Sequence, residues 1–255
     1  MKARGFLAAA ALLLCAGAAR AQAVVADLPT PLGTERAAFF AAPGARATVV
    51  LLAGGEGIVQ INQLGDTGNQ NFLIRTRAMW ASYGINAVIL GAPDNRPLTG
   101  QRSGAAYVAA LGAAVDFARS RGNAPVWLVG TSNGTISAAS GAAHLGGKVA
   151  GVVLTSSVTR MGRAGETVSS AGPAAITVPA LVVANSGDTC QASPPGAADA
   201  LLASMPASPR KEVMMFESHD IRSAPCEALS PHGYLGIEGS VIQRIAAWIN
   251  AAPGR

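Results

Sequence analysis

The stretch VWLVGTSNG, which spans residues 126–134, decides the interpretation of this 255-residue sequence. It opens with four apolar residues typical of a buried strand. The pattern G-x-S-x-G follows at once, with Gly130, Ser132 and Gly134 at its fixed positions. An Ala-, Gly- and Ser-rich segment typical of a helix comes next. A strand, a tight turn and a helix in this order are the setting in which a turn holds a serine as an exposed nucleophile. The two glycines are expected where neighbouring backbone passes close to the turn.

Apolar, β-branched runs alternate with helix-like stretches on both sides of this motif. Such runs separated by helices predict βαβ units and a doubly wound, mostly parallel sheet, an α/β fold. An antiparallel edge strand is expected over residues 34–42, and the absence of a clear linker predicts one domain over residues 24–255. The predicted strands cover residues 48–52, 86–90, 126–129, 149–154, 180–183 and 212–216, and the predicted helices cover residues 71–83, 103–121, 133–145, 196–205 and 238–249.

Composition excludes two classes of protein. Half of the residues are hydrophobic and only 13% are charged, which is too apolar for a disordered chain. The formal net charge of +5 suggests a nucleic-acid partner at first sight. However, Lys2, Arg4 and Arg20 all lie in the first 23 residues, and the rest of the chain has no dense run of basic residues. We therefore expect no nucleic-acid partner.

The first 23 residues have the pattern of a secretory signal peptide. Lys2 and Arg4 supply a positive end, and an apolar run covers residues 6–19, which is too short to span a bilayer. Small residues then recur in A-x-A spacing, which predicts cleavage after Ala23. No later stretch is apolar for long enough to form a membrane span, so we expect a periplasmic or secreted protein.

A lipoprotein is the alternative, because the residues that end at Cys15 roughly resemble a lipidation motif. In either case two later cysteines remain, Cys190 and Cys226. An even pair in an exported protein predicts a disulfide bond, which would close a loop of about 36 residues. Two buried free thiols are the other possibility.

A serine nucleophile needs a base, and the base needs an acid that orients it. The chain supplies Ser132, then Asp188 after a predicted strand, and then a histidine, in the order of an α/β-hydrolase. Asp94 is a weaker alternative acid. His232 is favoured as the base, because it lies in a Pro-His-Gly turn before the last predicted helix.

The two other histidines have simpler explanations. His219 lies in a polar segment that reads as a solvated turn, and His144 is expected near the end of a helix, where the helix dipole favours it. The three histidines show no metal-ligand spacing, so no metal is expected. Among the polar residues of the predicted helix over residues 71–83, Asn71, Arg75 and Arg77 are interpreted as a solvated face, with steering of an anionic substrate as the alternative.

The oxyanion of a serine hydrolase requires two backbone donors. One is expected to be the N–H of Asn133, the residue after the nucleophile. The glycine-rich loop after the strand at residues 48–52 should supply the other, with Gly55 preferred over Glu56. A dinucleotide-binding motif in this loop is excluded, because Gln60 occupies the position of its third glycine. No cofactor is expected.

At these residues the sequence resembles an α/β-hydrolase, within the exported dienelactone-hydrolase-like and prolyl-oligopeptidase-like bacterial group. The resemblance covers about residues 48–249 and implies Ser132, Asp188 and His232 as nucleophile, acid and base. The loop at residues 53–55 departs from the group because it lacks the His-Gly pair common before the oxyanion hole. A serine also stands where true dienelactone hydrolases use cysteine. About 24 residues, 155–178, separate two predicted strands, which leaves room for at most a small lid.

The expected function is hydrolysis of small-molecule carboxylic esters through an acyl-enzyme on Ser132. A peptidase or an acyltransferase with the same three residues remains possible. A non-catalytic binding protein on a hydrolase scaffold is the alternative from another functional class.

Overall fold

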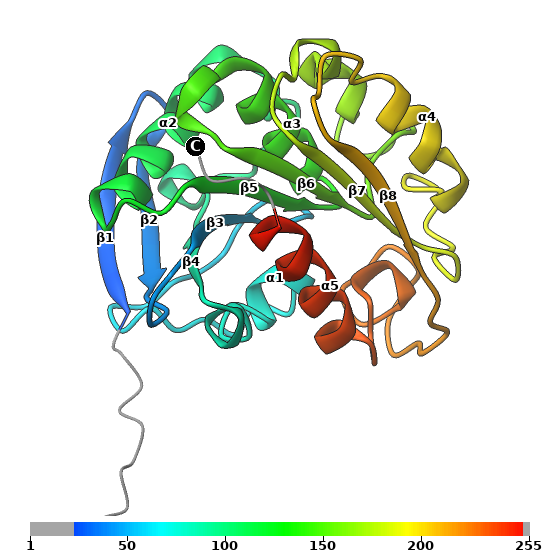
Figure 1. Ribbon diagram of the computed structural model, residues 1–255, viewed down its shortest axis with the longest axis horizontal. Helices are drawn as coiled ribbons and strands as arrows, with labels where there is room; N and C mark the ends of the chain where they lie inside the picture. The colour runs from blue at the N-terminus through cyan, green and yellow to red at the C-terminus, as the bar shows by residue number, and fades with distance from the viewer. Residues whose placement is uncertain (1–22, 252–255) are drawn as a thin grey trace, which may run out of the picture.

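One eight-stranded sheet organises residues 23–251, the part of the chain that the computed structural model describes (Figure 1). The strands lie in the order β1-β2-β4-β3-β5-β6-β7-β8. β1 and β2 form an antiparallel hairpin, β2 is antiparallel to β4, and the remaining neighbours are parallel. The bounds are β1 Val24–Thr30, β2 Gly33–Phe40, β3 Ala47–Leu52, β4 Ile85–Leu90, β5 Val126–Thr131, β6 Gly151–Thr155, β7 Ala180–Asn185 and β8 Lys211–Phe216.

Helices cover both faces of the sheet. Figure 1 shows α2, α3 and α4 on one face and α1 and α5 on the other. Each face has its own buried apolar cluster, built largely from Val, Leu, Ile and Ala. This confirms the predicted doubly wound, mostly parallel sheet. The bounds are α1 Phe72–Arg75, α2 Ala105–Ser120, α3 Gly134–His144, α4 Ala198–Ala203 and α5 Glu238–Asn250.

The predicted edge strand exists but does not lie at the edge. It is β2, and β1 pairs along its outer side. β1 was missed because its residues are partly exposed and include Asp27 and Pro29, so it lacks the apolar run that marks the buried strands. Edge strands tolerate both residue types, since one row of backbone groups faces solvent.

The predicted helix over residues 71–83 is wrong. α1 ends at Arg75, and the segment resumes only as the short 3-10 helix η1 Trp80–Tyr83. The Thr76 hydroxyl donates to the Phe72 carbonyl oxygen at 2.7 Å, in competition with the helical backbone ladder. The apolar residues at the start of this segment are consecutive in sequence and all buried, so burial rather than helical periodicity explains them.

Residues 156–179, between β6 and β7, contain no α-helix. They hold two 3-10 turns, η4 Val168–Ala171 and η5 Pro173–Ala175. This agrees with the expectation of at most a small lid. Within residues 23–251, no helix is both long enough and apolar enough to cross a bilayer. The predicted signal peptide, including Cys15, lies outside the described residues apart from Ala23.

Glu35 on β2 is a buried carboxyl, only 1% exposed, and its Oε2 atom has no hydrogen-bond partner among the described residues. Burial raises its pKa to about 8. In the unfolded chain the same carboxyl ionises near 4.5. The folded state therefore holds one more proton between these two values, and its stability falls as the pH rises from the lower value through the higher one.

We expect Glu35→Gln to remove this loss, because an amide carries no charge to bury. The variant should match the wild type near pH 4.5 and exceed it at pH 9 by roughly 3–5 kcal/mol in free energy of unfolding. Urea unfolding at several pH values measures this, with exposed Glu212→Gln as the control. Equal pH slopes in wild type and Glu35→Gln would contradict the assignment.

Candidate active site

Ser132 lies at the turn between β5 and α3 in a left-handed backbone conformation, with φ of 52°. Such a conformation is uncommon for a residue with a side chain and marks the strained turn that the sequence motif predicts. A Cβ on Gly130 would lie 2.2 Å from the Gly134 oxygen, and one on Gly134 would lie 2.0 Å from the Leu52 oxygen. Both positions therefore require glycine, as expected.

Asp188 and His232 form a buried pair. His232 Nδ1 lies 2.8 Å from Asp188 Oδ2, and the side chains are only 4% and 2% exposed. The second carboxylate oxygen, Oδ1, accepts from the Cys190 backbone N–H at 2.8 Å. A carboxylate held in this way keeps the imidazole proton on Nδ1 and leaves Nε2 as the basic nitrogen.

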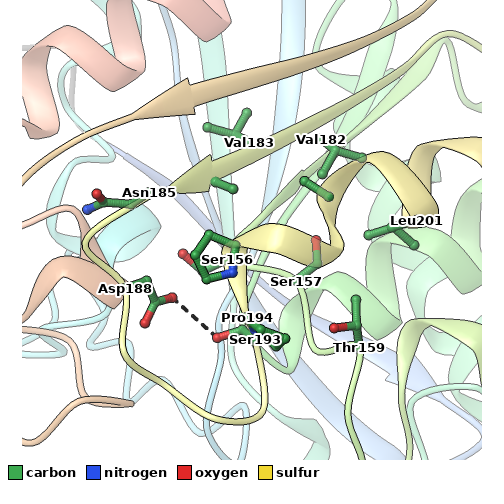
Figure 2. Close-up of a pocket in the computed structure, with 13 residues that line it drawn as sticks. Ser156, Ser157, Thr159, Val182, Val183, Asn185, Asp188, Ser193, Pro194 and Leu201 are labelled. Carbon is green, nitrogen blue, oxygen red and sulfur yellow. Dashed lines mark hydrogen bonds between the residues drawn. The ribbon is translucent and has the colours of Figure 1, made fainter.

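Ser193 joins this pair and was not found from the sequence. Its Oγ lies 3.0 Å from His232 Nδ1 and 3.3 Å from Asp188 Oδ2. Figure 2 shows the Asp188 and Ser193 side chains directed toward each other across the loop that follows β7. Nothing in the local sequence distinguishes this serine from the many others in the chain.

The His232 loop is fastened to the ends of β6 and β7. Ser156 Oγ donates to the His232 carbonyl oxygen at 2.8 Å, and Asn185 Nδ2 donates to that of Pro231 at 2.8 Å. The Tyr234 hydroxyl donates to the Val183 carbonyl oxygen at 2.9 Å. These bonds place the histidine at the carboxyl ends of the parallel strands, where ligands bind in open α/β sheets.

Hydrogen bonds connect Ser132 and His232 to two adjacent residues at the end of β6. The Ser132 N–H donates to the Thr155 carbonyl oxygen at 3.0 Å, and the adjacent Ser156 holds the His232 carbonyl. His232 Nε2 is buried and has no hydrogen-bond partner among the described residues, so it is not bonded to Ser132 Oγ here. Such links are often long in unliganded enzymes and tighten when substrate binds.

Free backbone donors flank Ser132. The N–H groups of Asn133, Gly55 and Glu56 have no acceptor among the described residues. The loop after β3 reaches the serine directly, since a Cβ on Gly54 would lie 2.8 Å from Ser132 Cβ. Asn133 Nδ2 also donates to the Gly55 carbonyl oxygen at 3.0 Å, which joins the turn at Ser132 to this loop.

The alternative acid and bases lie elsewhere. Asp94 accepts from the Thr34 N–H at 2.8 Å, beside the turn between β1 and β2. His219 is 74% exposed and contacts Glu217. His144 is the last residue of α3, at the far end of that helix from Ser132. None of the three is paired with Asp188 or His232.

Asn71, Arg75 and Arg77 do not form a solvated helix face, so that interpretation is wrong. Arg75 donates to the Gly233 carbonyl oxygen at 2.7 Å and forms an ion pair with Glu238 at 2.8 Å. It thus connects α1, the His232 loop and α5.

The other two polar residues of this segment also have partners. Asn71 Oδ1 accepts from the Leu73 N–H at 3.2 Å, and its Nδ2 lies 3.4 Å from the position of a Cβ on Gly54. Arg77 Nη1 donates to the Ile74 carbonyl oxygen at 3.1 Å. Asn71 therefore packs against the loop after β3, and Arg77 folds back onto its own segment.

A small cavity of about 10 Å³ lies beside Asp188 and is also lined by Ser157, Thr159 and Ser193 (Figure 2). It has room for one water-sized molecule. Within residues 23–251, no group of three or more His, Cys, Asp or Glu side chains is placed to hold a metal ion.

A disulfide bond joins Cys190 and Cys226, with 4.7 Å between their Cα atoms. It ties the loop that carries Asp188 to the segment that precedes His232. Replacing both cysteines by serine should lower the free energy of unfolding by about 3–4 kcal/mol, because the loop-closure constraint on the unfolded chain is lost. Hydrolytic turnover should fall as well, because the loop that carries Asp188 loses its covalent link to the segment before His232.

Thermal unfolding and turnover of the double variant measure these two effects. The reduced wild type is the matched control and should behave in the same way. A double variant that keeps both wild-type stability and wild-type turnover would show that the bridge supports neither.

Comparisons with known proteins place the fold. No family model matches the sequence, and no curated protein matches it. The dienelactone hydrolase of Anabaena variabilis superposes with a TM-score of 0.64 at 14% identity, covering 89% of this chain and 96% of that protein. A lidless α/β serine hydrolase from Xanthomonas campestris gives 0.62 at 15% identity, covering 91% and 98%.

A cold-adapted esterase from an Arctic intertidal metagenomic library gives a TM-score of 0.61 at 16% identity, covering 88% of this chain and 92% of that one. The coverage extends over nearly the whole of each protein, while the identities are low. The likeness therefore concerns the arrangement of the chain in space. Together with the strand order and the turn at Ser132, it shows that this chain has the α/β-hydrolase fold.

Proposed function

We propose that the chain is a serine hydrolase that cleaves carboxylic esters of small molecules. Ser132 is the nucleophile, His232 the general base and acid, and Asp188 the residue that orients the imidazole. The observation that carries this proposal is the buried Asp188–His232 pair, whose Oδ2 and Nδ1 atoms are 2.8 Å apart. The pair lies at the carboxyl ends of the strands, as does the left-handed turn at Ser132. The cold-adapted esterase among the structural neighbours supports the choice of an ester.

In the first half of the reaction, Ser132 Oγ attacks the ester carbonyl carbon and its proton passes to His232 Nε2. That nitrogen is the free one, because Nδ1 is held by Asp188. The tetrahedral oxyanion accepts from the N–H groups of Asn133 and Gly55. His232 then gives its proton to the leaving alcohol oxygen as the C–O bond breaks, and an acyl-enzyme remains on Ser132.

In the second half, a water molecule attacks the acyl carbonyl while His232 Nε2 takes its proton. Collapse of the second tetrahedral intermediate returns the proton to Ser132 Oγ and releases the carboxylic acid. With only two 3-10 turns between β6 and β7, the site needs no large opening movement to admit substrate or release product.

Two measurements test the proposal. A fluorophosphonate probe should label the protein, and peptide mapping should place the label on Ser132. Release of p-nitrophenol from esters of graded acyl length should be measurable, whereas a matched peptide anilide should be cleaved far more slowly. Absence of labelling would favour a binding protein, and faster anilide cleavage would favour a peptidase.

We also propose that the protein is exported to the periplasm or secreted. The Cys190–Cys226 disulfide supports this, because such bonds persist in oxidising compartments. N-terminal sequencing of the protein recovered from an expressing bacterium tests it. A mature chain starting at Val24 is expected, and a chain that retains Met1 or starts at a lipidated Cys15 would contradict cleavage after Ala23.

A further inference from the structure

Arg102 is a charged side chain in the protein interior. It lies between β4 and α2, is only 2% exposed, and is among the largest fully buried side chains. Burial lowers the pKa of Arg102, while Tyr107 and Glu166 oppose that shift. Enclosing a guanidinium costs free energy unless its contacts offset the lost hydration. The partners of this side chain therefore indicate why it is there.

The guanidinium joins two walls of the candidate active site. Arg102 Nη1 donates to Ser137 Oγ at 2.8 Å, and Nη2 donates to the Gly55 carbonyl oxygen at 3.1 Å. Ser137 belongs to α3, one turn after Asn133, and Gly55 belongs to the loop that carries the other oxyanion donor. The side chain thus connects the elements that supply the two donors.

No carboxylate lies within ion-pair distance of the Arg102 guanidinium in the described part of the chain. The nearby Glu166 instead accepts from the backbone N–H groups of Arg102 and Ser103, at 3.0 and 2.9 Å. Glu166 therefore fixes the backbone of Arg102, and the charged end of the side chain points at the Gly55 loop without a bonded counter-ion.

The contacts fix the orientation of one peptide unit. The Gly55 carbonyl oxygen accepts from Arg102 Nη2 on one side and from Asn133 Nδ2, at 3.0 Å, on the other. Because a peptide unit is planar, holding this carbonyl fixes the direction of the Glu56 N–H, the second candidate donor of the loop. It also anchors Gly55 itself, the residue whose own N–H is the preferred donor. The packing is close, since a Cβ on Gly57 would lie 2.9 Å from Arg102 Nη2.

We propose that Arg102 is a positioning residue of the oxyanion hole. Its guanidinium holds the Gly55 loop against α3 and keeps a fixed positive charge behind the backbone donors. Donors that are oriented in advance stabilise the negative charge of the transition state without reorganising during the reaction. This role rests on the proposed serine-hydrolase function and adds to it a residue that touches neither substrate nor triad.

Arg102→Met tests the role, because methionine fills much of the space without the charge or the donors. It should lower kcat by about 30- to 100-fold and leave KM within about twofold, since the lost interaction acts mainly in the transition state. The inhibition constant of an arylboronic acid, which forms a tetrahedral adduct with the serine, should rise by a similar factor. Arg102→Lys should recover part of the loss.

Arg210→Met is the matched control. Arg210 also donates to a backbone carbonyl, that of Trp248, but it precedes β8 and lies away from the Gly55 loop. It should change thermal stability without changing kcat or boronic acid affinity. If Arg102→Met does not fold, Ser137→Ala removes the acceptor of the Arg102 Nη1 hydrogen bond without changing any charge. It should lower kcat by roughly 3- to 10-fold.

Fluorophosphonate labelling distinguishes a failure of the proposed function from a failure of the proposed role of Arg102. If the wild type is not labelled, the proposed function fails, and the role of Arg102 fails with it. If the wild type is labelled and Arg102→Met is labelled at the same rate with unchanged kcat, only the role of Arg102 is overturned. A kcat loss no larger than that of Arg210→Met would overturn it as well.

Discussion

Replacing Ser132 by alanine should lower ester turnover by about five orders of magnitude while the fold stays intact. Alanine removes the only atom that can form the acyl-enzyme, and the oxyanion donors alone leave a small residual rate. The fold should persist because Ser132 Oγ has no hydrogen-bond partner among the described residues. The Ser132 backbone N–H, which alanine keeps, bonds to the Thr155 carbonyl oxygen. Turnover of a p-nitrophenyl ester and circular dichroism measure the two effects.

Ser186→Ala is the control for this experiment. Ser186 follows β7 at the same end of the sheet, but it is exposed and lies outside the Asp188–His232 pair. Its variant should keep wild-type turnover. A Ser132→Ala protein that retains more than about one hundredth of wild-type turnover would exclude Ser132 as the nucleophile.

The buried strands were predictable because their signal is local and strong. The parallel strands are covered on both faces, so they appear in the sequence as short apolar runs. β5 and α3 were the clearest case, since the motif at Ser132 marks where the strand ends and where the helix begins. β1 and the segment after Asn71 were less predictable, because a partly exposed edge strand and a short helix depend on neighbours that the local sequence does not specify.

The residues of the candidate site also differ in how far the sequence alone predicts them. Ser132, Asp188 and His232 each follow a predicted strand, and their order along the chain suggested their roles. Ser193 and Arg102 carry no such mark. The role of Ser193 depends on its loop folding back onto His232, and that of Arg102 depends on the contacts with Glu166 and the Gly55 loop that enclose it. Residues that position others are defined by contacts between distant segments.

Asp188→Asn should lower kcat by about 10⁴-fold with little change in the fold. The Cys190 N–H requires an acceptor at the position of Oδ1, so the amide oxygen of the variant should remain there. The amide nitrogen then faces His232 Nδ1, where it donates a hydrogen bond. Nδ1 must become the acceptor, and the ring proton moves to Nε2. An imidazole in this tautomer cannot take the proton of Ser132, although every atom of the site stays near its place.

The pH dependence and a matched variant distinguish this explanation from a loss of structure. Asp199→Asn changes an exposed aspartate in the first turn of α4 and should leave turnover unchanged. Asp188→Asn should unfold at nearly the wild-type temperature, yet its turnover should recover as hydroxide replaces the missing base at high pH. Turnover within tenfold of the wild type at neutral pH would mean that another group orients His232, and Ser193, already 3.0 Å from Nδ1, is the one placed to do so.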